Sequence, residues 1–173
     1  MDALVRERAY LAEQLTALER CAYFAMLVAT KIDWPLTAEA LRAHRLDGDY
    51  FEPLAALNER FAKLQDVLGS TMRHVAFMLA EPTPTFLNVL VFFEKHQVIA
   101  SVAQWHRVRK MRNDAAHDYD LDLAATAAHF NQIHEELPEL VQTAVRLVAF
   151  CQQWLDCTPL DHELHHVLIT RLS

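Results

Sequence analysis

Residues 130–154, FNQIHEELPELVQTAVRLVAFCQQW, decide the fold class of this chain. Apolar residues recur there at alternating steps of three and four, which is the spacing of one face of an α-helix. The stripe consists of Phe130, Ile133, Leu137, Leu140, Ala144, Leu147, Cys151 and Trp154. We therefore expect a long amphipathic helix that is capped by Asp120 or Asp122 and is kinked or restarted at Pro138.

The same spacing predicts further helices. One stripe begins at Leu4 and should end before Pro35, because proline disfavours helical geometry in the residue that precedes it. A second stripe runs from Leu57 to Leu79 and includes Gly69, which reflects either a close helix contact or, as we favour, simple tolerance. Thr85 should begin a mostly buried helix, and one more helix should carry Trp105 in the core.

The region from Ile32 to Pro53 reads as an extended connector between long helices. Thr37 is placed to cap a short helix through Arg45, and the chain should turn at residues 46–49. Two glycines in the chain are few for a turn-rich sheet, and no linker or repeat divides the sequence. We expect an all-α, up-and-down bundle of four to five main helices, forming one domain over residues 1–173.

The composition of the chain limits its partners and its compartment. A formal net charge of -7 excludes a general nucleic-acid coat, which requires excess lysine and arginine. Three cysteines without a CxxC pair indicate reduced structural thiols. The apolar run from Cys21 to Ala29 is roughly half the length needed to cross a bilayer, and no secretory signal follows Met1. These features predict a soluble, cytoplasmic protein without membrane contact.

Residues 111–119, MRNDAAHDY, concentrate chemically versatile side chains. Arg107, Arg109 and Lys110 precede them, so that positive charge gathers in an otherwise acidic chain. We predict that these three residues contact RNA phosphates. An equally weighted interpretation is a solvated helix face.

Arg112, Asn113, His117 and Tyr119 form the pattern RN-x3-H-x-Y. With it, roughly Leu57 to Leu147 resembles the HEPN superfamily, and most closely the HepT-like toxins and the related nucleotidyltransferase substrate-binding proteins. The resemblance implies a homodimer that acts as a metal-independent endoribonuclease toxin at the dimer cleft. It also implies a minimal nucleotidyltransferase antitoxin that attaches AMP to Tyr119. The alternative is a non-catalytic partner protein that binds the nucleotidyltransferase.

The motif suits RNA cleavage chemically. His117 has an ordinary pKa of about 6.5 and can serve as general base or acid. Arg112 keeps its charge and can stabilise the phosphorane, while Asn113 can orient the imidazole or a phosphate. Arg112 and His117 diverge by about 140° on a straight helix, so either the helix ends before His117 or a second copy completes the site. An adenylate on Tyr119 would add bulk and negative charge where RNA enters.

Other patterns have simpler explanations. Residues 162–166 match H-E-x-x-H, which can bind zinc on a helix, but a solvated helix end is favoured so close to the last residue. Phe86, Phe92 and Phe93 fit a core or a dimer surface rather than a cofactor site. We therefore expect neither a metal nor a cofactor. Without the resemblance, Arg112 and His117 would be ordinary surface residues at a helix end, and Tyr119 a half-buried hydrogen-bonding residue.

Overall fold

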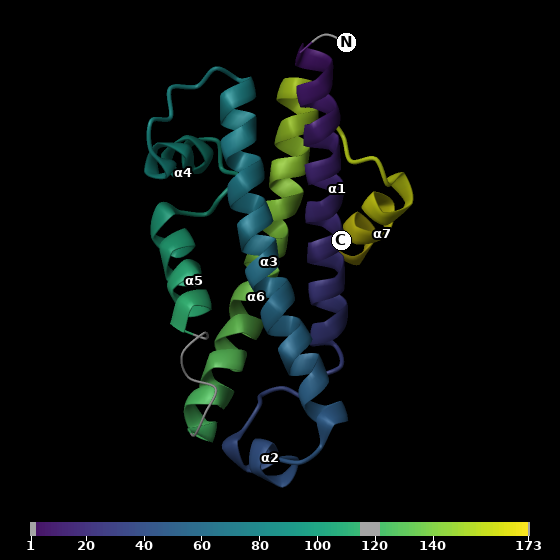
Figure 1. The fold of residues 1–173 in the computed structure, drawn as a ribbon, viewed down its shortest axis with the longest axis vertical. Helices are drawn as coiled ribbons and strands as arrows, with labels where there is room; N and C mark the ends of the chain where they lie inside the picture. The colour runs from purple at the N-terminus through teal and green to yellow at the C-terminus, as the bar shows by residue number, and fades with distance from the viewer. Residues whose placement is uncertain (1–2, 115–121, 173) are drawn as a thin grey trace.

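The described part of the chain, residues 3–114 and 122–172 of this computed structural model, is helical and contains no strand. Its helices are α1 (Ala3–Ala29), α2 (Ala38–Ala43), α3 (Gly48–Met78), α4 (Phe86–Lys95), α5 (Val102–Asp114), α6 (Leu123–Leu155) and α7 (His162–Leu172). The long helices α1, α3 and α6 lie side by side, with α4 and α5 on one side, α7 on the other and α2 at one end (Figure 1). The predicted all-α bundle is confirmed.

The core of the bundle consists of the predicted stripes. Leu11, Leu15 and Leu18 of α1 are fully buried, and so are most positions of the stripes in α3 and α6. Burying a leucine side chain stabilises the fold by about 1.5–3 kcal/mol relative to leaving it exposed, so the shared core holds the three long helices together. Trp154, the last position of the α6 stripe, is half exposed.

Side-chain caps begin the helices where the sequence predicts them. Asp122 accepts hydrogen bonds from the backbone N–H groups of Ala124 and Ala125. Thr85 forms a reciprocal capping box with Asn88 at the start of α4, and Thr37 caps α2. Each cap satisfies backbone donors that the first helical turn leaves without partners.

Two prolines lie inside helices rather than at their ends. The predicted connector from Ile32 to Pro53 is too long, because α3 already begins at Gly48 with Asp47 as its N-cap. The α6 helix likewise continues through Pro138, so the restart that the sequence allowed there does not occur. Each proline removes one backbone hydrogen bond, but buried residues on both sides of Pro138, and from Leu54 onward after Pro53, keep the two helices against the bundle.

Gly69 of α3 lies opposite two aromatic rings. A Cβ atom built on it would be 3.4 Å from Cζ of Phe86 and 3.5 Å from Cζ2 of Trp105. These are ordinary van der Waals distances, so the packing does not demand a glycine. The geometry supports tolerance, which the sequence analysis favoured over a required close approach.

The α7 helix packs against α1, while His162, Glu163 and His166 of the H-E-x-x-H pattern are exposed, as predicted for a solvated helix end. Leu168 is fully buried, and the backbone N–H of Leu160 donates to the hydroxyl of Thr16 over 2.8 Å. His165 contacts the carboxylate of Glu19, which is 1% exposed. The H-E-x-x-H pattern therefore lies on a helix whose middle histidine supports tertiary structure.

None of the helices in the described ranges is long and apolar enough to cross a membrane. The three cysteines all lie within those ranges and are unpaired. Burial raises the pKa of the Cys151 thiol, which lies near Cys157. A thiol that resists ionisation is a poor nucleophile, so Cys151 fits the structural role predicted for it.

Candidate functional site: an arginine pocket beside the motif

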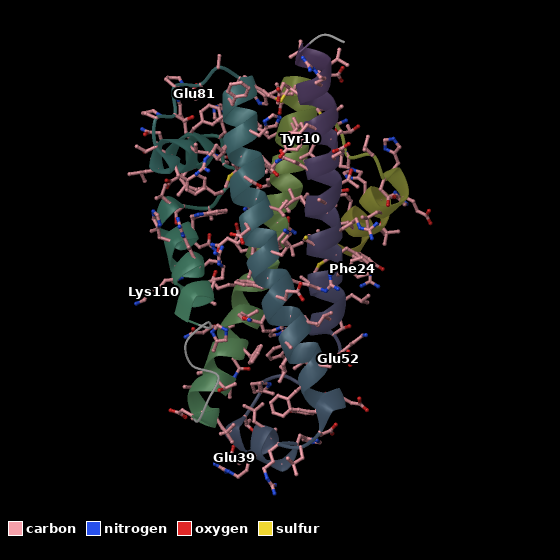
Figure 2. The ribbon with its side chains drawn as sticks, viewed as in Figure 1. Tyr10, Phe24, Glu39, Glu52, Glu81 and Lys110 are labelled. Carbon is pink, nitrogen blue, oxygen red and sulfur yellow. The ribbon has the colours of Figure 1, made fainter. Side chains whose placement is uncertain are left out.

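The α5 helix distributes its charged residues over several faces. Trp105 and Val108 are buried against the bundle, which fixes the rotation of the helix about its axis. Arg109 and Lys110 are exposed, and Lys110 projects outward from the bundle on the far side of α5 (Figure 2). The basic residues of α5 therefore do not form a single surface.

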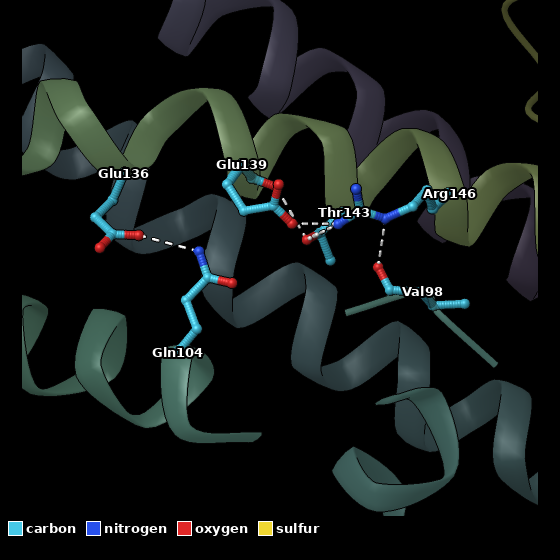
Figure 3. Close-up of polar contacts among 6 residues, drawn as sticks. All are labelled: Val98, Gln104, Glu136, Glu139, Thr143 and Arg146. Atoms are coloured by element: carbon cyan, nitrogen blue, oxygen red, sulfur yellow. Dashed lines mark hydrogen bonds and ion pairs between the residues drawn. The ribbon is translucent and has the colours of Figure 1, made fainter. Parts of the chain in front are cut away.

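Arg107 faces α6. Its Nε atom donates to Glu136 over 3.0 Å, and Nε2 of Gln104, one turn earlier, donates to the other oxygen of the same carboxylate over 3.1 Å. Figure 3 shows the Gln104 contact beside a second group of contacts, in which Arg146 of α6 donates a hydrogen bond to the backbone carbonyl of Val98. These contacts fasten both the start of α5 and the segment before it to α6.

A pocket of about 210 Å³ lies between α3, α4 and α5. We call it the arginine pocket, because guanidinium groups from α3 and α5 line it together with two aromatic rings. It is lined by Gln65, Asp66, Gly69, Ser70, Arg73, Phe86, Trp105, Arg109 and Arg112. It therefore combines positive charge with apolar surface at the end of α5 that leads into the motif.

The three arginines of the pocket have different environments. Arg112 forms an ion pair with Asp66 of α3, and its side chain is 30% exposed. The guanidinium of Arg73 lies over the ring of Phe86, with 4.9 Å between Cζ and the ring centroid. Arg109 has no hydrogen-bond or ion-pair partner within residues 3–114 and 122–172. Within those ranges Arg109 is therefore unpaired, while Arg112 is engaged by a carboxylate.

Two of the residues that line the pocket, Gln65 and Trp105, carry buried polar atoms with unused hydrogen-bonding capacity. Nε2 of Gln65 donates to the backbone carbonyl of Trp105 over 3.4 Å. Oε1 of Gln65 and Nε1 of Trp105 are buried and find no partner in the described part of the chain. Buried polar atoms normally have partners, so these two unmet hydrogen bonds are a local cost of packing α5 against α3.

The predicted site residues are only partly brought together. Arg112 and Arg109 line the arginine pocket, whereas Arg107 faces α6 and Lys110 faces solvent. The roles assigned to His117 and Tyr119 fall outside the described residues, and so does the role assigned to the side chain of Asn113. The contact of Arg107 and Lys110 with RNA stays a prediction.

Sequence reasoning missed the contribution of α3 to the pocket. Asp66, Ser70 and Arg73 follow one another at steps of four and three, so they share one helical face beside the apolar stripe. That spacing is a signal that could have identified a polar face. It does not reveal which helix lies opposite, and that information comes only from the packing of α5.

The described residues contain no group of three or more histidine, cysteine, aspartate or glutamate side chains that could hold a metal ion. No family model, curated protein or solved structure matches this chain. The resemblance to the HEPN superfamily consequently stays a hypothesis that depends on the residues of the motif. The arginine pocket is a separate observation that depends on geometry.

Proposed function

We propose that this chain is a metal-independent endoribonuclease toxin, which binds RNA at the arginine pocket and cleaves it with Arg112 and His117. The observation that carries the proposal is the convergence of Arg73, Arg109 and Arg112 on one pocket, next to the motif of an otherwise acidic chain. One guanidinium group can bind two phosphate oxygens at once, and aromatic rings nearby can stack on the base of a nucleoside. Asn113 is assigned to positioning.

The reaction needs no bound cofactor. His117 takes the proton of a ribose 2′-hydroxyl, and the 2′-oxygen attacks the adjacent phosphorus. Arg112 stabilises the charge that develops on the phosphorane oxygens. The bond from phosphorus to the 5′-oxygen then breaks, and that oxygen receives a proton. The products are a 2′,3′-cyclic phosphate and a 5′-hydroxyl, so a His117 side chain from each copy of a homodimer could provide the base and the acid.

The proposal includes a partner and a means of control. A minimal nucleotidyltransferase antitoxin in the same cytoplasm would transfer AMP from ATP to the phenolic oxygen of Tyr119 and release pyrophosphate. The added phosphate is negative and would repel the RNA phosphates that Arg112 attracts. Modification would therefore stop binding rather than unfold the protein.

We expect Arg112→Ala and His117→Ala each to lower the rate of RNA cleavage by at least about 100-fold, because each removes a group that acts in the transition state. The measurement is cleavage of a purified single-stranded RNA, resolved on a denaturing gel with and without EDTA. Arg42→Ala is the matched control, since it removes one positive charge from an exposed arginine of α2 that does not line the pocket. The control should lose no more than about threefold.

Different outcomes would exclude parts of the proposal. Intact RNA together with tight binding to a nucleotidyltransferase would replace the nuclease with the non-catalytic partner protein. Cleavage that EDTA abolishes would exclude the metal-independent reaction. Equal losses in Arg42→Ala and Arg112→Ala would show that total charge, not the pocket, governs the activity.

Incubation with the partner nucleotidyltransferase and ATP should add AMP to Tyr119. Intact-mass spectrometry measures the addition, and peptide mapping locates it. Tyr119→Phe should prevent modification, whereas Tyr10→Phe, which alters a half-exposed tyrosine on α1, should not. AMP attached at Tyr10 or at any residue other than Tyr119 would contradict the assignment.

A further inference from the structure

We propose that Asp66 is an internal competitor of RNA, which occupies Arg112 in the arginine pocket until an RNA phosphate displaces it. The inference rests on the proposed function for the identity of the ligand. It goes beyond the motif, because Asp66 belongs to α3 and lies 46 residues before Arg112. It assigns to this carboxylate the control of affinity for single-stranded RNA.

The contact between Asp66 and Arg112 can be exchanged for another. Oδ1 of Asp66 pairs with Nη1 of Arg112, and the aspartate side chain is 58% exposed. Ion pairs in contact with water stabilise proteins weakly. A phosphodiester offers two anionic oxygens to the planar guanidinium, so it can replace the carboxylate without loss of charge pairing.

The surrounding charges favour that replacement. Arg109 has no partner in the described ranges, and Arg73 contacts the face of an aromatic ring rather than a carboxylate. Asp66 is the acidic residue among those that line the pocket. An anion that displaces it therefore meets three guanidinium groups and leaves the carboxylate to water.

The aromatic rings of the pocket favour a nucleotide over a bare phosphate. Phe86 and Trp105 line the pocket together with the three guanidinium groups, and aromatic side chains provide stacking surfaces for bases. The combination of three cations with aromatic surface selects single-stranded RNA, whose bases are accessible, as the ligand class.

Asp66→Asn tests the competition with almost no change of shape. The variant frees Arg112, and we expect it to bind single-stranded RNA about 3- to 10-fold more tightly. Glu52→Gln is the matched control, since it removes one negative charge from an exposed residue of the same helix that does not line the pocket. That control should change affinity by less than about twofold.

The binding experiment uses the full chain with His117→Ala, which prevents cleavage during the titration. Fluorescence anisotropy of a labelled single-stranded RNA gives the dissociation constant at several salt concentrations. Freeing one guanidinium should steepen the logarithmic salt dependence of Asp66→Asn by about 0.7. Adding Arg112→Ala should cancel the gain from Asp66→Asn, because the competition acts through that arginine. Thermal denaturation checks that every variant is folded.

The outcomes separate this inference from the proposed function. Equal affinities of Asp66→Asn and Glu52→Gln would overturn the inference even if the native chain cleaves RNA. A gain that survives Arg112→Ala would overturn it as well. Tighter binding of Asp66→Asn by a chain that never cleaves RNA would uphold the inference and refute the nuclease. AMP bound as tightly as the RNA, with the same dependence on Asp66, would overturn RNA as the ligand.

Discussion

Trp105→Ala is expected to lower the free energy of unfolding by about 3–5 kcal/mol, because it removes a large buried ring and leaves a cavity. The side chain is 6% exposed and lies against Phe86 and Gly69, so it joins α5 to both α3 and α4. No other tryptophan of the chain is buried as deeply. Equilibrium denaturation with urea, followed by circular dichroism, measures the loss.

Trp154→Ala is the matched control, because it removes the same side chain from an exposed position. That ring is 51% exposed and stacks on Phe150, with 5.6 Å between the ring centroids. We expect a loss of about 1 kcal/mol, since much of its surface already contacts water. A loss at Trp105 no greater than that at Trp154 would contradict the burial of the α5 anchor.

His165→Ala is expected to destabilise the fold by about 2–3 kcal/mol at neutral pH, because it leaves the carboxylate of Glu19 buried without its partner. Nδ1 of His165 lies 2.5 Å from Oε1 of Glu19, while Oε2 of the same carboxylate has no hydrogen-bond partner within the described ranges. The contact joins α7 to α1. His166→Ala is the control, since that neighbour is exposed and should change stability by less than about 0.5 kcal/mol.

The same pair predicts how stability depends on pH. Desolvation raises the pKa of Glu19 above its ordinary value of 4.5, although the hydrogen bond and charge of His165 act in the opposite direction. The folded state therefore holds this proton to higher pH than the unfolded state does. Protonated Glu19 therefore stabilises the fold fully at pH values below its ordinary pKa. This stabilisation is lost as pH rises through the raised pKa of the folded state.

Glu19→Gln removes this titration and serves as the reference. The unfolding free energy of the native chain minus that of Glu19→Gln should decrease as pH rises from 4.5, and should level off above the raised pKa of Glu19. Urea denaturation at a series of pH values measures the difference. A difference that rises with pH would contradict the direction of the shift.

Local signals predicted most of the fold. The α6 stripe and the caps at Thr37, Thr85 and Asp122 depend on residues only a few positions apart, and all three caps are present. Pro53 misled the prediction of where α3 begins, and α6 does not restart at Pro138. A proline acts locally, whereas the packing that keeps a helix continuous comes from other helices. The docking of α7 was missed for the same reason, since the partner of His165 is 146 positions away.

The candidate site was only half predictable. The sequence pointed to the α5 arginines because they lie in or just before the motif. A helix turns by about 100° per residue, so Arg107 and Arg109 lie about 200° apart around the axis of α5. That separation sends Arg107 towards Glu136 and Arg109 into the arginine pocket. The ion pair of Arg112 with Asp66 spans 46 residues, so no spacing within one helix could reveal it.

The arginine pocket lies at the edge of a bundle whose apolar centre is formed mainly by α1, α3 and α6. Arg109 and Arg112 contribute none of the buried apolar surface that holds those helices together. Related sequences could therefore exchange these residues, and with them the ligand, while the scaffold persists. In this architecture, substitutions that change the pocket need not be substitutions that unfold the protein.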